Sequence, residues 1–247
     1  NNKDWGPQPV RLVISSQGTQ GLGIAAANDD EINSISDLRG KRVIFVLGAD
    51  AMNKTTEAVL AYGGLSWDDV VKFNVAGPNE AIEAMINGNA DAMPVSTGNP
   101  VVERILASPR GMKWLQMPNE TQEEKEAWKR TQHVAPYYQP YFSTKGNGVS
   151  VEKPWHGGGY GHPSIITTDK QTSDEVYALT KFIYGNFDAL SGSAPGAIGW
   201  ALERQNFNWV MPYHEGAVRY FKEAGVWNEQ HEAHNQALIQ RQNVLQT

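Results

Sequence analysis

The sequence predicts an α/β fold built around a largely parallel sheet, and two observations lead to this prediction. Residues 43–47 form a run of five apolar residues, which suits a strand that helices cover on both faces. From residue 43 to residue 106, strand-like runs alternate with helix-like runs, which is the pattern of a doubly wound sheet. Ligands of such sheets bind beside the carboxyl ends of the strands. The loops that follow the strands are therefore where a site is expected.

The N-terminal part of the chain leads into this first buried strand. Residues 8–16 and 21–27 are expected to be two strands joined by a turn at residues 17–20. Ser36 and Asp37 can cap a one-turn helix directly before the apolar run. A strand, a small-residue loop and a helix N-terminus then follow one another, and this arrangement lets backbone N–H groups converge on an anion.

Two further strand–helix units are expected after the first one. The expected elements are a loop at 48–57, a helix at 58–62 ending at Gly63 and Gly64, a strand at 70–75, a helix from Pro78 to Gly88, a strand at 90–95 and a helix at 101–106. Pro94 falls inside the third strand, so it is expected at the end of that strand or on an edge of the sheet. Under the strand-end rule, the loops that follow the first and third strands face the same cleft.

The composition changes between residues 112 and 162. A strand at 112–117 and a charged helix at 120–130 precede a segment, residues 137–160, that is rich in Tyr, Gly and Pro. Long loops of this kind in compact domains usually carry function, so this segment is expected to be a functional loop.

The C-terminal part has clearer helix signals. Thr172 and Glu175 have capping-box spacing before an amphipathic helix, after a strand at 164–168. A second helix is expected at 217–224, and the polar, Gln-rich tail from residue 228 is expected to be a weak helix.

Composition excludes several classes of protein. A net charge of −6 without a basic stripe argues against a nucleic-acid partner. No apolar run approaches the roughly 18 residues that a membrane span needs. The absence of cysteine excludes disulfides and cysteine-based metal sites. The first residues lack the apolar centre of a signal peptide, so any export signal is expected to have been removed or to lie outside this chain.

Three segments together resemble one family of proteins. Residues 35–43 are similar to the "I-x-S-x-x-DLKGKRV" segment of bacterial extracytoplasmic solute-binding proteins, and residues 80–92 are similar to that family's "EA-x-x-A" segment ending in "DA". Residues 212–225 resemble the "P-x-H-x-GA" signature of the TAXI receptors of TRAP transporters. The resemblance extends over most of the chain, from about residue 32 to residue 225.

This resemblance implies a type II periplasmic binding protein-like fold, with two doubly wound α/β lobes and a hinge. Lobe I is expected at residues 1–33 and 163–247, lobe II at residues 34–162, and the hinge strands near 22–27 and 164–168. The family's N-terminal segment, with its glycine-rich "TGG" loop, does not appear here, so the first lobe is expected to be incomplete. Either a piece was lost or cleaved, or a second chain supplies it, or the sheet of this lobe is built differently. The family's "GSGT" loop is also replaced, by residues 48–55.

The same resemblance implies a function. The chain is expected to be a periplasmic receptor that captures a small organic solute, a carboxylate or an amino acid, between its lobes and delivers it to TRAP permease subunits in the membrane. A sensory module of the same fold, which would signal to a membrane partner, is the alternative.

The candidate ligand-binding residues lie in two strand-end loops and in the aromatic segment. Asn53, Lys54 and Thr55 are expected at a helix N-terminus, where backbone donors and the helix dipole favour a carboxylate. A plain helix cap explains them equally well. The full set adds Ser96, Thr97, Gly98 and Asn99 from the second loop, and Trp155, His156 and Tyr160 around the triple glycine.

Catalytic and metal-binding patterns are weak in this sequence. No serine stands in a nucleophile elbow, and the paired carboxylates at 68–69 and 123–124 fall in positions that are usually solvated. The histidine pairs, His156 with His162 and His231 with His234, lack a matching carboxylate pattern for metal. No catalytic residue, metal or cofactor is therefore predicted, and an enzyme on this scaffold stays the least favoured alternative.

Overall fold

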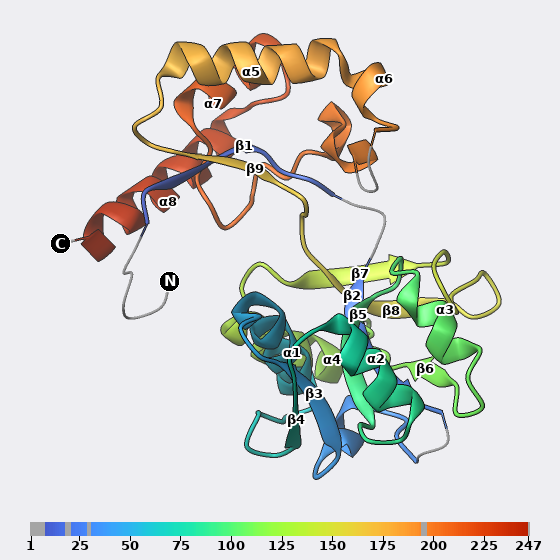
Figure 1. Cartoon of the computed structure of the whole chain (residues 1–247). Coiled ribbons are helices and arrows are strands. Elements are labelled where there is room, and N and C mark those ends of the chain that lie inside the picture. The colour runs from blue at the N-terminus through green and yellow to red at the C-terminus, as the bar shows by residue number, and fades with distance from the viewer. Residues whose placement is uncertain (1–7, 18–20, 29–30, 194–196, 247) are drawn as a thin grey trace. The chain divides into compact units, whose positions relative to one another are not determined.

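The computed structural model describes residues 8–17, 21–28, 31–193 and 197–246, and it divides the chain into two compact units (Figure 1). The first unit consists of residues 1–19 and 161–247, and the second of residues 20–160. We expected the first boundary after residue 33, but the structure has it after residue 19. The reason is that β2 (Leu22–Ala27) pairs with three strands of the second unit.

The second unit contains a mixed sheet with the strand order β4-β3-β5-β2-β8-β7, and β6 also pairs with β2. Its other strands are β3 (Arg42–Val46), β4 (Val71–Val75), β5 (Ala92–Ser96), β6 (Met112–Trp114), β7 (Gln139–Ser143) and β8 (Trp155–Gly159). β3 lies parallel to β4 and β5, whereas β2 is antiparallel to its neighbours. The α/β class and the three expected strand–helix units are confirmed.

Helices cover both faces of this sheet. They are α1 (Asp50–Tyr62), α2 (Pro78–Ile86), α3 (Val101–Leu106) and α4 (Gln122–Val134), and a one-turn helix, η1 (Ile35–Leu38), precedes β3. Val43 packs in a core with residues of α1 and α4, and Ile44 and Val46 pack in another with residues of α2 and α3. The alternation along β3 therefore sends its side chains into two different cores, as expected for a strand covered on both faces.

Pro94 lies in the middle of the sheet, so the expectation of an edge or a strand end is wrong. The Ala27 N–H donates to the Asp91 carbonyl, and the Thr97 N–H donates to that of Gly21. The backbone groups of odd-numbered residues in β5 therefore bond to β2, and the backbone of Pro94 is directed at β3. β3 and β5 pair only at Val43 and Ala92. Because Pro94 has no N–H to donate, the ladder between β3 and β5 cannot continue past that pair.

The aromatic segment is also not the long loop that its composition indicates. β7 and β8 form an antiparallel pair within residues 137–160, and Gly157 and Gly159 belong to β8. The two N-terminal strands likewise do not form a hairpin, because β1 (Val10–Ile14) pairs with β9 (Ile165–Thr168) in the first unit. The expected turn falls mostly on residues 18–20, outside the described residues.

The first unit combines the β1–β9 pair with helices. These are α5 (Ser173–Gly185), α6 (Phe187–Leu190), η2 (Ala197–Trp200), η3 (Leu202–Arg204), α7 (Glu215–Glu223) and α8 (Glu229–Gln246). α5 packs on α7, and both contact β1 (Figure 1). Thr172 caps α5 as expected, and His214 caps α7 through a bond from the Gly216 N–H to its Nδ1 (3.1 Å). His214 therefore has a structural role in the TAXI-like segment.

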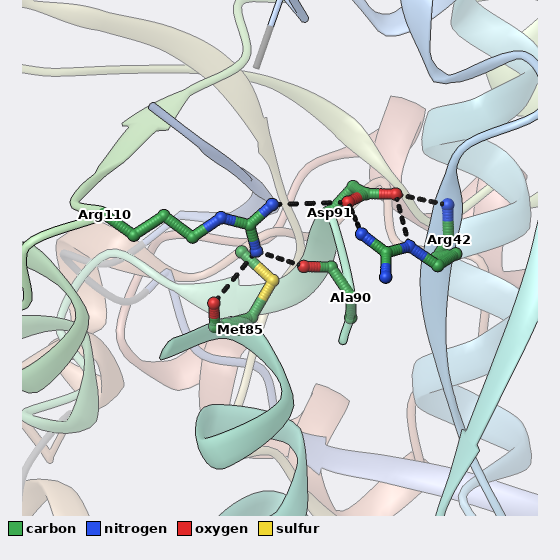
Figure 2. A network of polar contacts seen from close by, with 5 residues as sticks. All are labelled: Arg42, Met85, Ala90, Asp91 and Arg110. Atoms are coloured by element: carbon green, nitrogen blue, oxygen red, sulfur yellow. Dashed lines mark hydrogen bonds and ion pairs between the residues drawn. The ribbon is translucent and has the colours of Figure 1, made fainter. Parts of the chain in front are cut away.

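The second unit also contains a buried ionic network around Asp91 (Figure 2). The Asp91 carboxylate accepts bonds from the backbone N–H (2.8 Å) and Nε (3.0 Å) of Arg42, and Nη2 of Arg110 lies 3.3 Å away. The Arg110 guanidinium also donates to the Met85 carbonyl (2.9 Å) and to the Ala90 carbonyl. Arg42 and Asp91 belong to two of the segments that carry the family resemblance, so those segments meet in a structural network.

This network predicts a loss of stability in acid. Burial alone would raise the pKa of Asp91, but the hydrogen bonds and charges of Arg42 and Arg110 hold that pKa below its ordinary value. A carboxyl whose pKa is lowered by folding stabilises the native state above its unfolded pKa, near 4, and this contribution disappears as the pH falls through the folded pKa. Urea unfolding at pH 7, 5, 4 and 3 should show the stability difference between the wild type and Asp91→Asn shrinking below about pH 4. An unchanged difference at pH 3 would contradict this assignment.

Candidate functional site

A small pocket lies at the carboxyl ends of β3 and β5 in the second unit. We call it the strand-end pocket, and its volume is about 160 Å³. It is lined by Leu22, Ile44, Val46, Met52, Pro78, Ala81, Ile82, Met93, Pro94, Val95, Ser96, Asn99 and Val101. The β3 and β5 residues among them all come after the Val43–Ala92 pair, so the pocket lies where the ladder between these strands has ended. Met52 from the first turn of α1, Ser96 from the end of β5 and Asn99 from the loop after β5 thus border a single pocket.

The helix beside this pocket begins earlier than the sequence indicates. α1 starts at Asp50, and Ala49 before it makes no side-chain cap. The open backbone N–H groups of the first turn therefore belong to residues 50–52. The expectation that Asn53, Lys54 and Thr55 stand at the helix N-terminus is wrong, because all three lie inside the helix.

Asn53 holds α1 against the end of β3. Its Oδ1 accepts a bond from the Val46 N–H (3.1 Å), and its Nδ2 donates to the Val46 carbonyl (2.7 Å). The side chain is buried. Because the backbone of Val46 uses both ends of this amide, we assign Asn53 a structural role in place of the predicted ligand contact.

The variant Asn53→Ala is expected to lose about 2 kcal/mol of stability, because it removes the partner of the buried Val46 N–H and one donor to the Val46 carbonyl, which keeps the bond from the Ala49 N–H (3.2 Å). Lys54→Ala is the matched control, since Lys54 is half exposed and pairs with Glu57 on the surface (3.2 Å). That control should stay within about 0.5 kcal/mol of the wild type in urea unfolding. Equal losses in the two variants would contradict the assignment.

Thr55 and Tyr160 come together through a third residue. The Thr55 hydroxyl lies 3.3 Å from the Tyr137 hydroxyl, and the Tyr137 and Tyr160 rings pack edge to face with centroids 5.2 Å apart. Burial, with a smaller contribution from Tyr137, raises the pKa of Tyr160. These hydroxyls do not line the strand-end pocket, so they form a separate polar group in the second unit.

The residues of the second strand-end loop, 96–99, have different roles. Thr97 is fully buried, and its hydroxyl accepts a bond from the Gly21 N–H (3.2 Å), which fixes the loop to the start of β2. The Asn99 Oδ1 accepts a bond from the N–H of Val101 (3.1 Å), the first residue of the short helix α3. Ser96 and Asn99 line the pocket, whereas Thr97 and Gly98 do not. Thr97 therefore holds the loop against β2, and its ligand contact stays a prediction.

Trp155 and His156 differ in the same way. The Trp155 ring is 1% exposed and its Nε1 donates to the Leu115 carbonyl (2.9 Å), so Trp155 packs in the core, and its ligand contact stays a prediction. His156 is half-buried and packs against Phe142, with ring centroids 4.8 Å apart. Neither residue lines the strand-end pocket.

Sequence reasoning missed the apolar residues that line the pocket. Met52, Pro78, Ala81 and Val101 occupy the first turns of helices that follow β3, β4 and β5, and nothing in their residue type indicates a site. Their positions directly after the strands were the available signal. Within the described residues, no group of three or more metal-ligating side chains comes together.

A pocket at the carboxyl ends of parallel strands is where open α/β sheets bind small ligands, so the second unit has the organisation of a small-molecule binding domain. Residues 8–225 match the NMT1-like family. The chain therefore belongs to the NMT1-like family.

Several solved structures are also similar to this chain. The alkanesulfonate-binding protein SsuA from Xanthomonas axonopodis pv. citri is 15% identical, with 96% of this chain and 70% of that chain covered and a TM-score of 0.37. The aliphatic sulphonate binding protein SsuA from Escherichia coli is 16% identical, with coverages of 72% and 69% and a TM-score of 0.38. The L-cystine solute receptor of Neisseria gonorrhoeae is 16% identical, with a TM-score of 0.30, and the match covers 50% of each chain. The chain thus matches only half of the cystine receptor's length.

Proposed function

We propose that this chain is a solute-binding receptor of a membrane transport system. The observation that carries the proposal is the strand-end pocket, bordered by the first turn of α1 and by Ser96 and Asn99. The first-turn N–H groups of a helix favour an anionic group, so a carboxylate or the carboxyl end of an amino acid suits the mouth of the pocket. Membership of the NMT1-like family and the TAXI-like segment at 212–225 support a receptor over an enzyme.

The proposal includes where the protein works and with what. The receptor captures its solute in the periplasm and delivers it to a membrane permease. The sequence resemblance favours a TRAP permease, and a permease of an ABC transporter is the competing partner. No helix in the described part of the chain combines the length and the apolar character needed to cross a membrane.

Binding without turnover is the decisive test. The purified full chain is analysed by native mass spectrometry for a co-purified solute, and its melting temperature is measured with a panel of carboxylates, sulfonates and amino acids. A true solute at 100 times its Kd should add about 2.7 kcal/mol of stability. Each kcal/mol should raise Tm by about 2–4 °C in a chain of this size. A panel that leaves Tm unchanged, with no co-purified solute, would contradict the proposal, and a chemically altered solute would indicate an enzyme.

A further inference from the structure

We propose that the strand-end pocket takes a compact apolar group of its ligand, about the size of a benzene ring or a branched alkyl chain. The inference deepens the proposed function and rests on it for the biological ligand, since it names the part of the solute that enters the protein. The ligand class is a small acid or amino acid with such an apolar group, and a small polar dicarboxylate is excluded.

The size and lining of the pocket lead to this class. A cavity of about 150 Å³ lined by aliphatic side chains stays dry and binds benzene, and the strand-end pocket has about 160 Å³. Of the described residues that line it, only Ser96 and Asn99 have polar side chains. The rest are Leu, Ile, Val, Met, Ala and Pro, so nearly the whole wall is apolar.

The backbone of the lining offers little to a bound water. A buried water needs two to four polar partners. Pro78 and Pro94 have no N–H, and the Asn99 side-chain oxygen already accepts the bond from the Val101 N–H. The backbone oxygen of Asn99 accepts a bond from Nδ2 of Asn147 (2.7 Å). Apolar atoms of a ligand therefore fill this space at a lower free-energy cost than water does.

The charge of the ligand stays at the mouth. No lining residue is charged, and an ionised carboxylate inside such a wall would lose its hydration without gaining a partner. Met52 is 36% exposed and belongs to the first turn of α1, where the open N–H groups lie. A solute with its apolar group inside and its carboxylate beside this turn satisfies both parts of the site.

Benzene tests the pocket directly, because it needs no knowledge of the biological solute. The full chain is labelled with ¹³C at its methionine methyl groups and titrated with benzene. The methyl signals of Met52 and Met93, which line the pocket, should shift with saturation, whereas those of Met117 and Met211 should not. No shift at Met52 and Met93 up to the solubility of benzene would overturn the inference.

Two variants of α3 provide a matched pair. Val101 lines the pocket and is half-buried, so Val101→Phe should fill the space and weaken benzene binding at least 10-fold. Leu106 lies on the same helix, 36% exposed and outside the pocket, so Leu106→Phe should leave the affinity unchanged. Equal benzene affinities in the two variants would contradict the assignment.

A second measurement separates this inference from the proposed function. The full chain is titrated with phenylacetate and with acetate, which share a carboxylate and differ in the apolar group. Tighter binding of phenylacetate, lost in Val101→Phe, supports the inference. Binding of another solute without any benzene site overturns the inference and leaves the proposed function standing. Benzene binding without any stabilising acid or amino acid supports the pocket assignment and overturns the proposed function.

Discussion

Asp91→Ala should lower the free energy of unfolding by about 3–5 kcal/mol, because removing one partner of a buried ion pair leaves the remaining charge without compensation. The Asp91 side chain is 6% exposed and that of Arg110 is 12% exposed, so water reaches neither charge freely. Arg110 would keep its bonds to backbone carbonyls but would lose its carboxylate. Urea unfolding at pH 7 measures the loss.

An exposed ion pair of the same unit is the control for this variant. Glu83 and Arg104 lie 2.6 Å apart, but both side chains are about half exposed. Surface pairs of this kind contribute between about 0 and 1 kcal/mol, so Glu83→Ala should be nearly neutral. If Asp91→Ala costs no more than Glu83→Ala, the network around Asp91 is not a main source of stability.

The Asp91 network also shows what the family-like segments encode. The family resemblance includes residues 35–43 and 80–92, and the structure joins these two segments through Arg42 and Asp91. Neither of these two residues lines the strand-end pocket, whereas Ala81 and Ile82 of the second segment do. A pairing between residues 49 positions apart depends on the strand order β3–β5, which no local pattern states. Such segments identify the fold, and they do not by themselves locate the ligand.

Local signals predicted most of the elements correctly. Pro78 at the start of α2, Gly88 beyond its end (φ 74°) and Thr172 before α5 act within one or two turns of the chain, and each works as expected. The start of α1 was missed because Asp50 follows Ala49, which cannot cap, so the sequence offers no N-cap there. The boundaries of a helix can therefore be predicted from the sequence where a capping residue is present, and they are missed where it is not.

The candidate site was only partly predictable, because some of the polar side chains in the strand-end segments bond to the protein backbone. Ser96 and Asn99 line the strand-end pocket, and their ligand contact stays a prediction, whereas the side chains of Asn53 and Thr97 bond to backbone groups of Val46 and Gly21. A polar residue in a strand-end loop can equally face a ligand or a neighbouring strand. Only the tertiary structure decides between these roles.

The glycines around Trp155 gave the most misleading signal, and they lead to the second large prediction. The sequence predicts a loop here, yet Gly157 lies in β8 against the Trp155 ring. A Cβ atom at Gly157 would come within 1.9 Å of that ring, and one at Gly23 in β2 within 2.4 Å. Glycine is present because the indole occupies the space of a side chain.

Gly157→Ala should therefore destabilise the protein by about 3 kcal/mol, at the upper end of the cost of overpacking a core, because the buried indole has no free space to enter. Gly159→Ala on the same strand is the matched control. Its nearest neighbour, the Tyr141 Cβ, would lie 3.6 Å away, an ordinary contact. Alanine also orders a strand more easily than glycine does, so this control should be neutral or slightly stabilising.

A double-mutant cycle assigns the cost to the indole itself. Trp155→Leu removes the ring that the new methyl group would meet, so Gly157→Ala should cost much less in that background than in the wild type. Thermal and urea unfolding of the four proteins give the coupling energy. If Gly157→Ala costs the same in both backgrounds, or no more than Gly159→Ala, then the glycine is required by the backbone and not by Trp155.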